Sequence, residues 1–517
     1  MALELRQYQK DAANSLYLHW RNFKRLLTVM PTGTGKTIVF CKVAEYEAKR
    51  GRRVCILAHR EELLSQAQDK LRAATGMDSA LERAESSAIG DPRMITVASV
   101  NSMSQKRRLE QYSKSYFDLL IIDEGHRILS PSYMRILEHF DGARVASYTA
   151  TPGRSDKKSL AKVFECISYQ LSMKDAIRDG WIVPIMAQTI PVDVDLSAAK
   201  KHHGDIAVED ADTAIAPYLD ELARLTHKFA SDRKCLAFLP LCRTSASFAE
   251  KLTAAGMHCK HIQGNSKDRK EILAWYEEMG NGYVLSNAQL LSEGWDHPPV
   301  SSVEFYKPTE QKHVFMQAIG RGTRPYPGKE CLQVLDPIWS SEKFDVATSA
   351  SLVAESDEEE EKIKARVSAG GPVDLMEAQE EAHAEVTNER EAKLAKYIDE
   401  HKHRKGGLID IEQFGLWCHD EALLGYGLGD EAVFDWQKAP ASPDQVKRLA
   451  WHKLPSQGLT RGYADALLGT LDRNKEAGKP TPKQMRTIAR SGYEPSDYTF
   501  ETASRLITKL AKNWKRS

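Results

Sequence analysis

The sequence predicts an α/β protein with two doubly wound parallel sheets in tandem, followed by an acidic linker and a small all-α domain. Short continuous apolar runs alternate with amphipathic stretches from residue 1 to about 180, and the same alternation returns from about 181 to 345. The last part of the chain holds a repeat with a helix-start signal in each copy. A length of 517 residues fits three or four domains, and the 42% hydrophobic content is enough for sizeable cores.

The first domain is predicted to span residues 1–180 and to hold buried parallel strands. Each strand is an uninterrupted apolar run, which is what a parallel sheet covered by helices on both faces requires. The runs are Leu26–Met30, Val54–Ala58, Ile95–Ala98, Leu119–Ile122 and Val145–Tyr148. The second domain, predicted at residues 181–350, repeats this pattern. Its strands are expected at Leu236–Leu239, Tyr283–Leu285, Val303–Tyr306 and Leu332–Leu335.

Residues 351–405 are charged and poor in aromatic side chains, and the acidic run Glu355–Glu361 lies near their start. This composition predicts a disordered acidic linker that passes into a solvated, charged helix. Residues 406–440 carry aromatic side chains among glycines and receive no assignment.

Residues 441–517 are predicted to form a basic all-α domain of two helix-hairpin repeats. Ser442-Pro and Thr481-Pro, 39 positions apart, each provide a helix N-cap followed by proline at the first helical position. The segment holds 15 Lys+Arg against 7 Asp+Glu, an excess that suggests a polyanion partner. Basic residues occur in the first helix of both copies, at Lys447, Arg448, Lys483 and Arg486. A face that grips a nucleic-acid duplex, a face that docks a protein, and a capping domain with a solvated basic surface all remain open.

Composition excludes several other classes of protein. No apolar stretch approaches the ~20 residues that span a bilayer, and the first ten residues are mixed and polar, unlike a signal peptide. The eight cysteines form no C-x-x-C pair, which argues against a zinc knuckle and for reduced core thiols. We therefore expect a cytoplasmic protein of a bacterium, phage or similar source, without a membrane partner.

A phosphate-binding loop is predicted directly after the first strand, at Pro31–Thr37. Glycines in such a loop let backbone N–H groups approach phosphates, and the following helix adds the positive end of its dipole. Lys36 would reach the β- and γ-phosphates of ATP, and Thr37 would ligate Mg²⁺. The rest of the cradle is formed by Thr32, Gly33, Thr34 and Gly35. Met30 occupies the place that a first glycine takes in the general form of this loop.

An acidic pair follows the strand at 119–122, in the sequence Asp123-Glu124-Gly125-His126. A carboxylate at the end of a strand beside the phosphate loop is placed to hold Mg²⁺, which is the role predicted for Asp123. Glu124 would orient or deprotonate the attacking water. Alone, such a tetrapeptide could be an acidic surface turn, but the upstream phosphate loop favours the catalytic interpretation.

With these two motifs the chain resembles the DEAD/DEAH-box (DExH) helicases of superfamily 2, and in particular their XPB-like, RadD-like and type III restriction-like branch. Further segments resemble the motifs of that family in the family's order and cover roughly residues 1 to 340. They are Leu5–Gln9, Ala58–Leu63, Val97–Asn101, Thr149–Pro152, Phe238–Leu252, Leu291–Asp296 and Gln317–Arg324. The resemblance implies that both α/β domains are RecA-like. Some relatives carry a cysteine-rich zinc segment that this chain lacks.

The resemblance also implies roles for single residues. Arg6, Gln9 and Asp296 would bind the nucleotide, with Gln9 contacting adenine. Arg321 and Arg324 of the second domain would complete the catalytic site when the two domains close. Residues that couple nucleotide state to strand binding would be His126, Thr149, Thr151 and Gln317. Strand contacts would come from His59, Arg60, Ser99, Gly264, Ser292 and Glu293.

The sequence thus predicts an ATP- and Mg²⁺-dependent helicase or translocase, with single-stranded or forked DNA as the favoured partner. Contacts at such places are mainly to phosphate and sugar, so little sequence readout is expected. The family resemblance implies 3′-to-5′ movement. Two alternatives remain: an RNA helicase, and the motor subunit of a restriction or defence complex with a separate nuclease. A protein partner of the C-terminal domain is also possible.

Overall fold

The computed structural model describes residues 4–59, 61–150, 160–202, 204–264, 268–288, 290–291, 295–341, 343–401, 439–456, 458–493 and 495–514. Side chains are described for these residues apart from 61–63, 126, 390–401 and 511–514. The chain divides into two units, Met1–Val386 and Thr387–Ser517.

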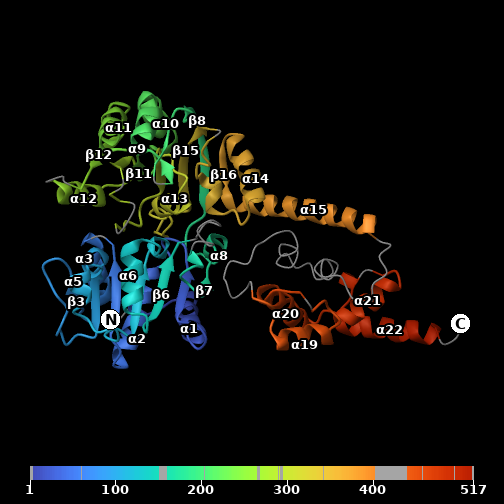
Figure 1. The fold of residues 1–517 in the computed structure, drawn as a ribbon. Coiled ribbons are helices and arrows are strands. Elements are labelled where there is room, and N and C mark those ends of the chain that lie inside the picture. The colour runs from blue at the N-terminus through green and yellow to red at the C-terminus, as the bar shows by residue number, and fades with distance from the viewer. Residues whose placement is uncertain are drawn as a thin grey trace. The chain divides into compact units, whose positions relative to one another are not determined.

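The larger unit contains two lobes, each built on one seven-stranded sheet (Figure 1). In the first lobe the strand order is β3-β4-β2-β5-β6-β1-β7, and every neighbouring pair is parallel. Its strands are β1 (Arg25–Val29), β2 (Val54–Ala58), β3 (Ala80–Glu82), β4 (Ile95–Ser99), β5 (Leu119–Asp123), β6 (Arg144–Thr149) and β7 (Cys166–Gln170). The five strands expected from apolar runs are all present.

Helices cover both faces of the first sheet. Successive residues of each strand point to opposite faces, so the sheet contributes to two separate cores. Leu26 and Ile56 belong to one core, whereas their neighbours Leu27 and Leu57 belong to the other. The first core is closed by α1 (Gln7–His19), α2 (Lys36–Lys49) and α3 (Glu61–Thr75). The second core is closed by α4 (Val100–Met103), α5 (Lys106–Leu109) and α6 (Pro131–His139), with η1 (Gly125–Arg127) leading into it. This is the doubly wound arrangement that the sequence predicts.

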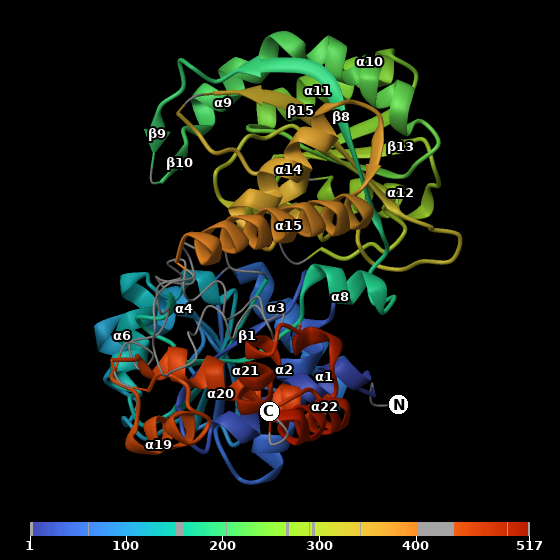
Figure 2. The same cartoon turned by 90° about the vertical axis from the view of Figure 1, so that its right-hand side faces the viewer.

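The second lobe has the strand order β12-β13-β11-β14-β15-β8-β16, parallel except for β16, which runs antiparallel to β8. Its strands are β8 (Ile185–Asp195), β11 (Cys235–Phe238), β12 (His258–Ile262), β13 (Tyr283–Asn287), β14 (Ser302–Phe305), β15 (Leu332–Ser340) and β16 (Pro372–Asp374). A two-stranded ribbon is formed by β9 (Lys201–His202) and β10 (Asp205–Ile206). The helices are α9 (Val208–Ile215), η2 (Ala216–Tyr218), α10 (Leu219–Ala230), α11 (Cys242–Ala254), α12 (Arg269–Glu278) and α13 (Lys312–Ile319). The helix that precedes them, α8 (Met173–Arg178), lies with the first lobe in Figures 1 and 2.

The expectation of a disordered linker from residue 351 is wrong for residues 351–386, which fold onto the second lobe. They form the end of η3 (Ser349–Leu352), then α14 (Asp357–Ser368), β16 and the start of α15 (Leu375–His401). Figure 1 shows α14 beside β16, and α14 also contacts β8. The acidic first turn of α14 is stabilised by the helix dipole and by Ser356, whose side chain caps the helix. Residues 402–438, which include most of the segment left unassigned, lie outside the described residues.

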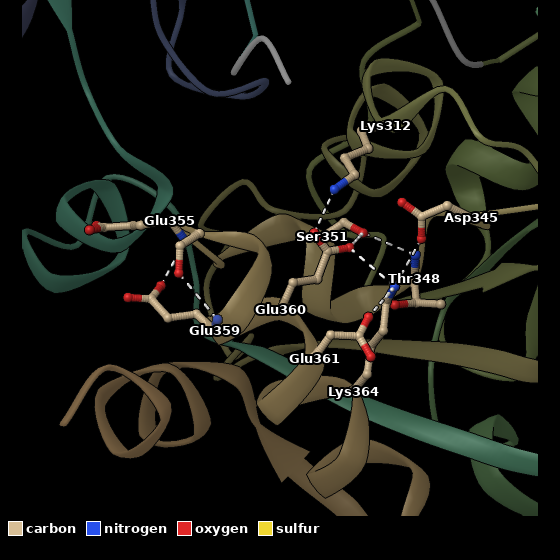
Figure 3. Close-up of polar contacts among 10 residues, drawn as sticks. Lys312, Asp345, Thr348, Ser351, Glu355, Glu359, Glu360, Glu361 and Lys364 are labelled. Carbon is tan, nitrogen blue, oxygen red and sulfur yellow. Dashed lines mark hydrogen bonds and ion pairs between the residues drawn. The ribbon is translucent and has the colours of Figure 1, made fainter. Parts of the chain in front are cut away.

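Buried partners explain why these acidic side chains are ordered. Glu360 of α14 pairs with Lys312 at the start of α13, with 2.5 Å between carboxylate oxygen and ammonium nitrogen. Its other carboxylate oxygen accepts a hydrogen bond from the Ser351 hydroxyl at 2.6 Å. Figure 3 shows these contacts together with the pair between Lys364 and Asp345. The acidic helix is therefore tied to the helix that leads to Arg321 and Arg324.

The smaller unit contains two similar pairs of helices (orange to red in Figure 2). They are α19 (Pro443–Trp451) with α20 (Arg461–Glu476), and α21 (Pro482–Arg490) with α22 (Phe500–Trp514), preceded by η4 (Pro495–Asp497). In each pair a capping-box glutamine joins the first helix to the second. Gln445 donates to the backbone oxygen of Arg461 and to Asp465, and Gln484 donates to the backbone oxygen of Phe500 and to Ser504. Such paired bonds at equivalent positions are what an internal repeat produces.

Candidate functional site

The loop between β1 and α2 has the backbone of an anion cradle. Gly33 and Gly35 have φ angles of 92° and 80°, in the left-handed region that glycine adopts most readily. The loop is fixed at one end because the Met30 N–H donates to the Thr149 backbone oxygen at 3.0 Å. Gly35 then starts α2, so the unpaired N–H groups of the first helical turn face the loop. Thr32 and Thr34 are buried within it.

Lys36 is the charged side chain of this loop, and it is buried. Its ammonium donates to the Met30 backbone oxygen at 3.1 Å, and the residue is only 9% exposed. Burial lowers the pKa of Lys36, the carboxylates of Glu124 and Asp123 act against that decrease, and the guanidinium groups of Arg321 and Arg324 add to it. Both acidic and both basic candidates therefore lie within electrostatic range of the Lys36 ammonium.

The acidic pair stands where β5 ends. Asp123 is the last residue of the strand, and its carboxylate accepts a hydrogen bond from the Glu124 N–H at 3.1 Å. Glu124 has φ 58° and ψ 58°, a left-handed conformation that costs a non-glycine residue roughly 1–3 kcal/mol and that clusters at functional sites. The turn is tight, because a Cβ at Gly125 would lie 2.3 Å from the Ser147 hydroxyl. The Asp123 carboxylate and the hydroxyl of Thr37, in the first turn of α2, are the kinds of hard oxygen ligand that Mg²⁺ prefers.

The two arginines reach the phosphate loop from the second lobe. They follow α13, and Arg321 is 8% exposed. The Thr323 hydroxyl donates to the backbone oxygen of Thr32 at 3.3 Å across the two lobes. A Cβ on Gly320 would lie 2.3 Å from Thr32 Cβ, so only glycine fits at this approach. A Cβ built on Gly33 would lie 3.6 Å from Arg324 Cγ, and burial at this place lowers the pKa of Arg324 to about 10.

The arginines also hold the segment before them. Arg321 donates to the Trp295 backbone oxygen at 2.8 Å, and Arg324 forms an ion pair with Asp296. Asp296 was expected to bind nucleotide, and the structure places its carboxylate on Arg324. Lys329, which sequence reasoning missed, braces the same turn by donating to the backbone oxygens of Gly322, Arg324 and Pro298.

The expected adenine-binding residues lie beside the loop. The Gln9 amide donates to the Thr34 backbone oxygen at 3.0 Å, and the Arg6 N–H donates to the Gln9 side-chain oxygen at 3.0 Å. Sequence reasoning missed two aromatic neighbours. Tyr8 donates to the same Thr34 oxygen at 2.7 Å, and Trp181 lies 4.8 Å from the Tyr8 ring and 5.4 Å from the Arg6 guanidinium. Tyr8 adjoins Gln9 within the first motif, but nothing in the sequence marks Trp181.

A second lysine, also missed, belongs to the cleft. Lys70 of α3 has a pKa lowered by burial, with Asp123 opposing this decrease and Arg321 and Arg324 adding to it. It therefore lies within electrostatic range of three of the groups that surround Lys36, namely Asp123, Arg321 and Arg324. A lysine in the middle of an amphipathic helix has no sequence signature that separates it from a surface residue.

Two of the four residues expected to couple nucleotide state to strand binding have described side chains. Thr149 ends β6, is buried, and provides the oxygen that holds Met30. Gln317 lies in α13 and is 3% exposed. Thr151 and the side chain of His126 lie outside the described residues.

The expected strand-contact residues follow the carboxyl ends of strands. His59 follows β2, Ser99 ends the adjacent β4, and Gly264 follows β12 closely in the second lobe. In open α/β sheets this edge is where ligands bind. Ser99 is 5% exposed, whereas Gly264 lies at the surface. Arg60, Ser292 and Glu293 lie outside the described residues.

Two lobes that bring a phosphate loop, an acidic pair and two arginines to one cleft define a two-lobed P-loop nucleotide-hydrolase architecture. Family models agree with this class. The type III restriction enzyme res-subunit model matches residues 2–154, and the helicase conserved C-terminal domain model matches residues 217–325. The chain thus carries the two domains of a superfamily 2 helicase, and these matches are consistent with the restriction-like branch.

Several known proteins are similar over much of the chain. The helicase IRC3 of Saccharomyces cerevisiae is 26% identical over 68% of this chain and 54% of its own length. The mitochondrial helicase irc3 of Schizosaccharomyces pombe is 30% identical over 70% of this chain and 62% of its own length. The chain thus spans somewhat more than half the length of these relatives.

Solved structures support the fold. The type ISP restriction-modification enzyme LlaBIII superposes with a TM-score of 0.53 at 13% identity, covering 99% of this chain and 43% of that chain. A fragment of an HsdR subunit from Vibrio vulnificus superposes with a TM-score of 0.51 at 22% identity, covering 66% of this chain and 67% of that chain. Among the described residues, no helix combines the length and apolar character needed to cross a membrane.

Proposed function

We propose that this chain is an ATP-dependent helicase or translocase that moves along DNA. The observation that carries the proposal is the close approach of Gly320 to Thr32, which brings Arg321 and Arg324 to the phosphate loop of the other lobe. An arginine supplied across a cleft makes hydrolysis depend on closure of that cleft, since the transition-state charge is neutralised only in the closed arrangement.

Each residue then has a defined task. The loop N–H groups and Lys36 hold the phosphates, and the Thr37 hydroxyl and Asp123 carboxylate would hold Mg²⁺, which neutralises charge on the β- and γ-phosphates when bound. Glu124 orients a water in line with the γ-phosphorus and takes its proton. Phosphoryl transfer needs charge neutralisation and positioning rather than covalent catalysis, so this set of side chains is sufficient.

The same arginines supply a route from nucleotide to strand. Arg321 and Arg324 bind the Trp295 backbone oxygen and the Asp296 carboxylate. Residues 292 and 293, expected to contact a strand, lie one position before this pair in the chain, with residue 294 between them. A phosphate group that draws Arg324 toward Lys36 competes with Asp296 for that guanidinium. Hydrolysis and phosphate release would return Arg324 to Asp296 and shift the strand-binding segment.

The choice of DNA rests on the relatives. The matching family model is that of a restriction-enzyme subunit, and a type I restriction enzyme EcoAI endonuclease subunit of Escherichia coli is 25% identical over 66% of this chain. These matches also favour a second candidate, the motor subunit of a restriction complex that works with a separate nuclease. A nuclease subunit that co-purifies in fixed stoichiometry would distinguish that candidate from an independent helicase.

The test is ATP hydrolysis by the full chain, alone and with single-stranded DNA, duplex, forked DNA or RNA of matched length. DNA should stimulate turnover more than RNA. Lys36→Ala should abolish turnover, because Lys36 is the one cationic side chain between Pro31 and Thr37. Arg50→Ala, a matched cation exposed at the far end of α2, should leave turnover unchanged. Retained hydrolysis in Lys36→Ala would remove the mechanism, and equal stimulation by RNA would remove the choice of DNA.

A further inference from the structure

A groove runs between the two helix pairs of the smaller unit. Its volume is 1090 Å³, and it is lined by α19, the end of α20, the turn that follows, and the starts of α21 and α22. The turn is narrow because Gly478 takes φ 65°, and its backbone oxygen accepts the Phe500 N–H at 2.8 Å. The repeat therefore creates the groove, since the short turn between the copies sets the second pair against the first.

An exposed indole stands in this groove. Trp451, the last residue of α19, is 80% exposed, the largest exposed fraction among the large hydrophobic side chains described. Phe500, at the start of α22, also lines the groove and is 49% exposed. Aromatic rings bury on the order of 150–250 Å² when they find a partner, so leaving an indole in water forgoes a large gain. The second copy has Arg490 in the equivalent place, which shows that the repeat itself does not require tryptophan there.

The groove is also basic. Four cationic side chains line it, Lys447, Arg448, Lys475 and Lys479, against two carboxylates, Asp444 and Asp472. Arg448 and Asp472 pair with each other at 3.3 Å. The lining thus carries four cations against two carboxylates, around an exposed aromatic ring. Lys483 and Arg486, which the sequence also singled out, are not among the lining residues.

We propose that this groove binds single-stranded nucleic acid, with phosphates against Lys447, Lys475 and Lys479 and a base stacked on Trp451. Proteins that grip single strands without sequence preference combine basic grooves with aromatic platforms in this way. A duplex fits less well because its bases are already stacked on each other. The site is separate from the ATP cleft in composition and position in the chain, so it neither requires nor supplies hydrolysis.

The test is equilibrium binding of the nucleotide-free full chain to a fluorescein-labelled oligothymidine of roughly 20 nucleotides, longer than a typical single-strand site. Trp451→Ala should weaken binding by about 5- to 100-fold, the range that loss of one base–aromatic stack gives. Lys475→Ala/Lys479→Ala should weaken it and flatten its salt dependence, because fewer counterions are released. Matched controls outside the groove are Tyr493→Ala, an exposed aromatic of the second copy, and Lys483→Ala/Arg486→Ala.

Photocrosslinking tests the contact directly, using oligonucleotides that carry 5-iodouracil. A crosslink to Trp451 is expected for single strands, and parallel DNA and RNA arms identify which nucleic acid is preferred. Affinity of Trp451→Ala within about twofold of wild type, crosslinks confined to residues 1–386, or equal weakening by the controls would overturn the proposal. ATP turnover without nucleic acid, measured on the same samples, should be unchanged in every groove variant. Failure of the motor proposal is a different result, because it would appear as ATP turnover that is retained in Lys36→Ala.

Discussion

Replacing Gly320 with alanine would test the closed cleft by adding a single methyl group. Gly320 follows α13 and directly precedes Arg321, and its backbone angles, φ −58° and ψ −13°, are ones that alanine adopts freely. The added Cβ would nevertheless lie 2.3 Å from Thr32 Cβ and 2.5 Å from Thr32 Cγ2, both on the opposite lobe. The substitution therefore disturbs the approach of the lobes. It also brings the added Cβ within 2.9 Å of the Met316 backbone oxygen, so the last turn of α13 must shift slightly as well.

The size of the effect follows from the overlap. Non-bonded carbon atoms rest about 3.5–4.0 Å apart, so the lobes must separate by about 1 Å at this point. A misplacement of about 1 Å can reduce a catalytic rate on the order of 100-fold. We therefore expect kcat for ATP to fall about 100-fold, short of the ~10³ to 10⁵ that complete loss of an arginine finger can cause. The first lobe keeps its phosphate loop, so ATP affinity should change by less than about threefold.

The assay is steady-state ATP hydrolysis with saturating single-stranded DNA, together with binding of a fluorescent ATP analogue. Gly280→Ala is the matched control, because it lies in the same lobe and a Cβ there would meet nothing within 4 Å. Thermal unfolding of both variants separates a local clash from misfolding. Wild-type kcat in Gly320→Ala would refute the reasoning, since it would mean that hydrolysis occurs without this approach of the lobes.

Two further predictions concern stability. Burial raises the pKa of Glu304 from 4.5 to about 7. Between these two values the folded state keeps a proton that the unfolded chain releases. The free energy of unfolding therefore falls as pH rises from about 4.5 through 7. Glu304→Gln should remove about 3 kcal/mol of this loss, because glutamine does not titrate. The urea midpoint of the variant should therefore exceed that of wild type at pH 8 but not at pH 4. A difference that does not depend on pH would contradict the assignment. Glu360→Ala leaves Lys312 without its carboxylate and should destabilise the second lobe by about 2 kcal/mol, as measured by urea unfolding. Glu361→Ala is the control, and it should have little effect because the Glu361 side chain is 75% exposed.

The central strands could be predicted because their signal lies in their own residues. A strand buried on both faces must be apolar throughout, and β2 and β5 are. Strands near the sheet edges carry no such signal. β12 reads His-Cys-Lys-His-Ile, and β8 alternates buried and exposed residues toward its end. β12 is held by backbone hydrogen bonds to β13, which no property of its own side chains reveals. The alternation in β8 is a strand signal, but it differs from the continuous apolar runs by which the other strands were recognised.

The acidic segment could not be predicted for a related reason. Low hydrophobicity and high charge predict disorder only if the charges remain in water. Glu360 and Glu359 instead meet Lys312 and His383, 48 and 24 positions away in the chain. Long-range neutralisation of this kind is invisible in composition. The same limit applies to Trp181 and Lys70, whose place in the cleft depends on tertiary contacts alone.

The electrostatics of the cleft explain why a polyphosphate suits it. Lys36, Lys70, Arg321 and Arg324 are four cations, and three of them have a pKa lowered mainly by burial. The carboxylates near them are Asp123, Glu124 and Asp296, so the described groups carry one positive charge in excess. A lowered pKa means that the charged form of the side chain is less well solvated than in water. Protein dipoles and carboxylates therefore replace only part of the water lost around these cations. A multiply charged anion would replace that solvation and draw the two lobes together at the same time. Ligand binding, closure and arrival of the arginines would therefore occur as one step, which is the property a motor needs if each hydrolysis is to drive one movement.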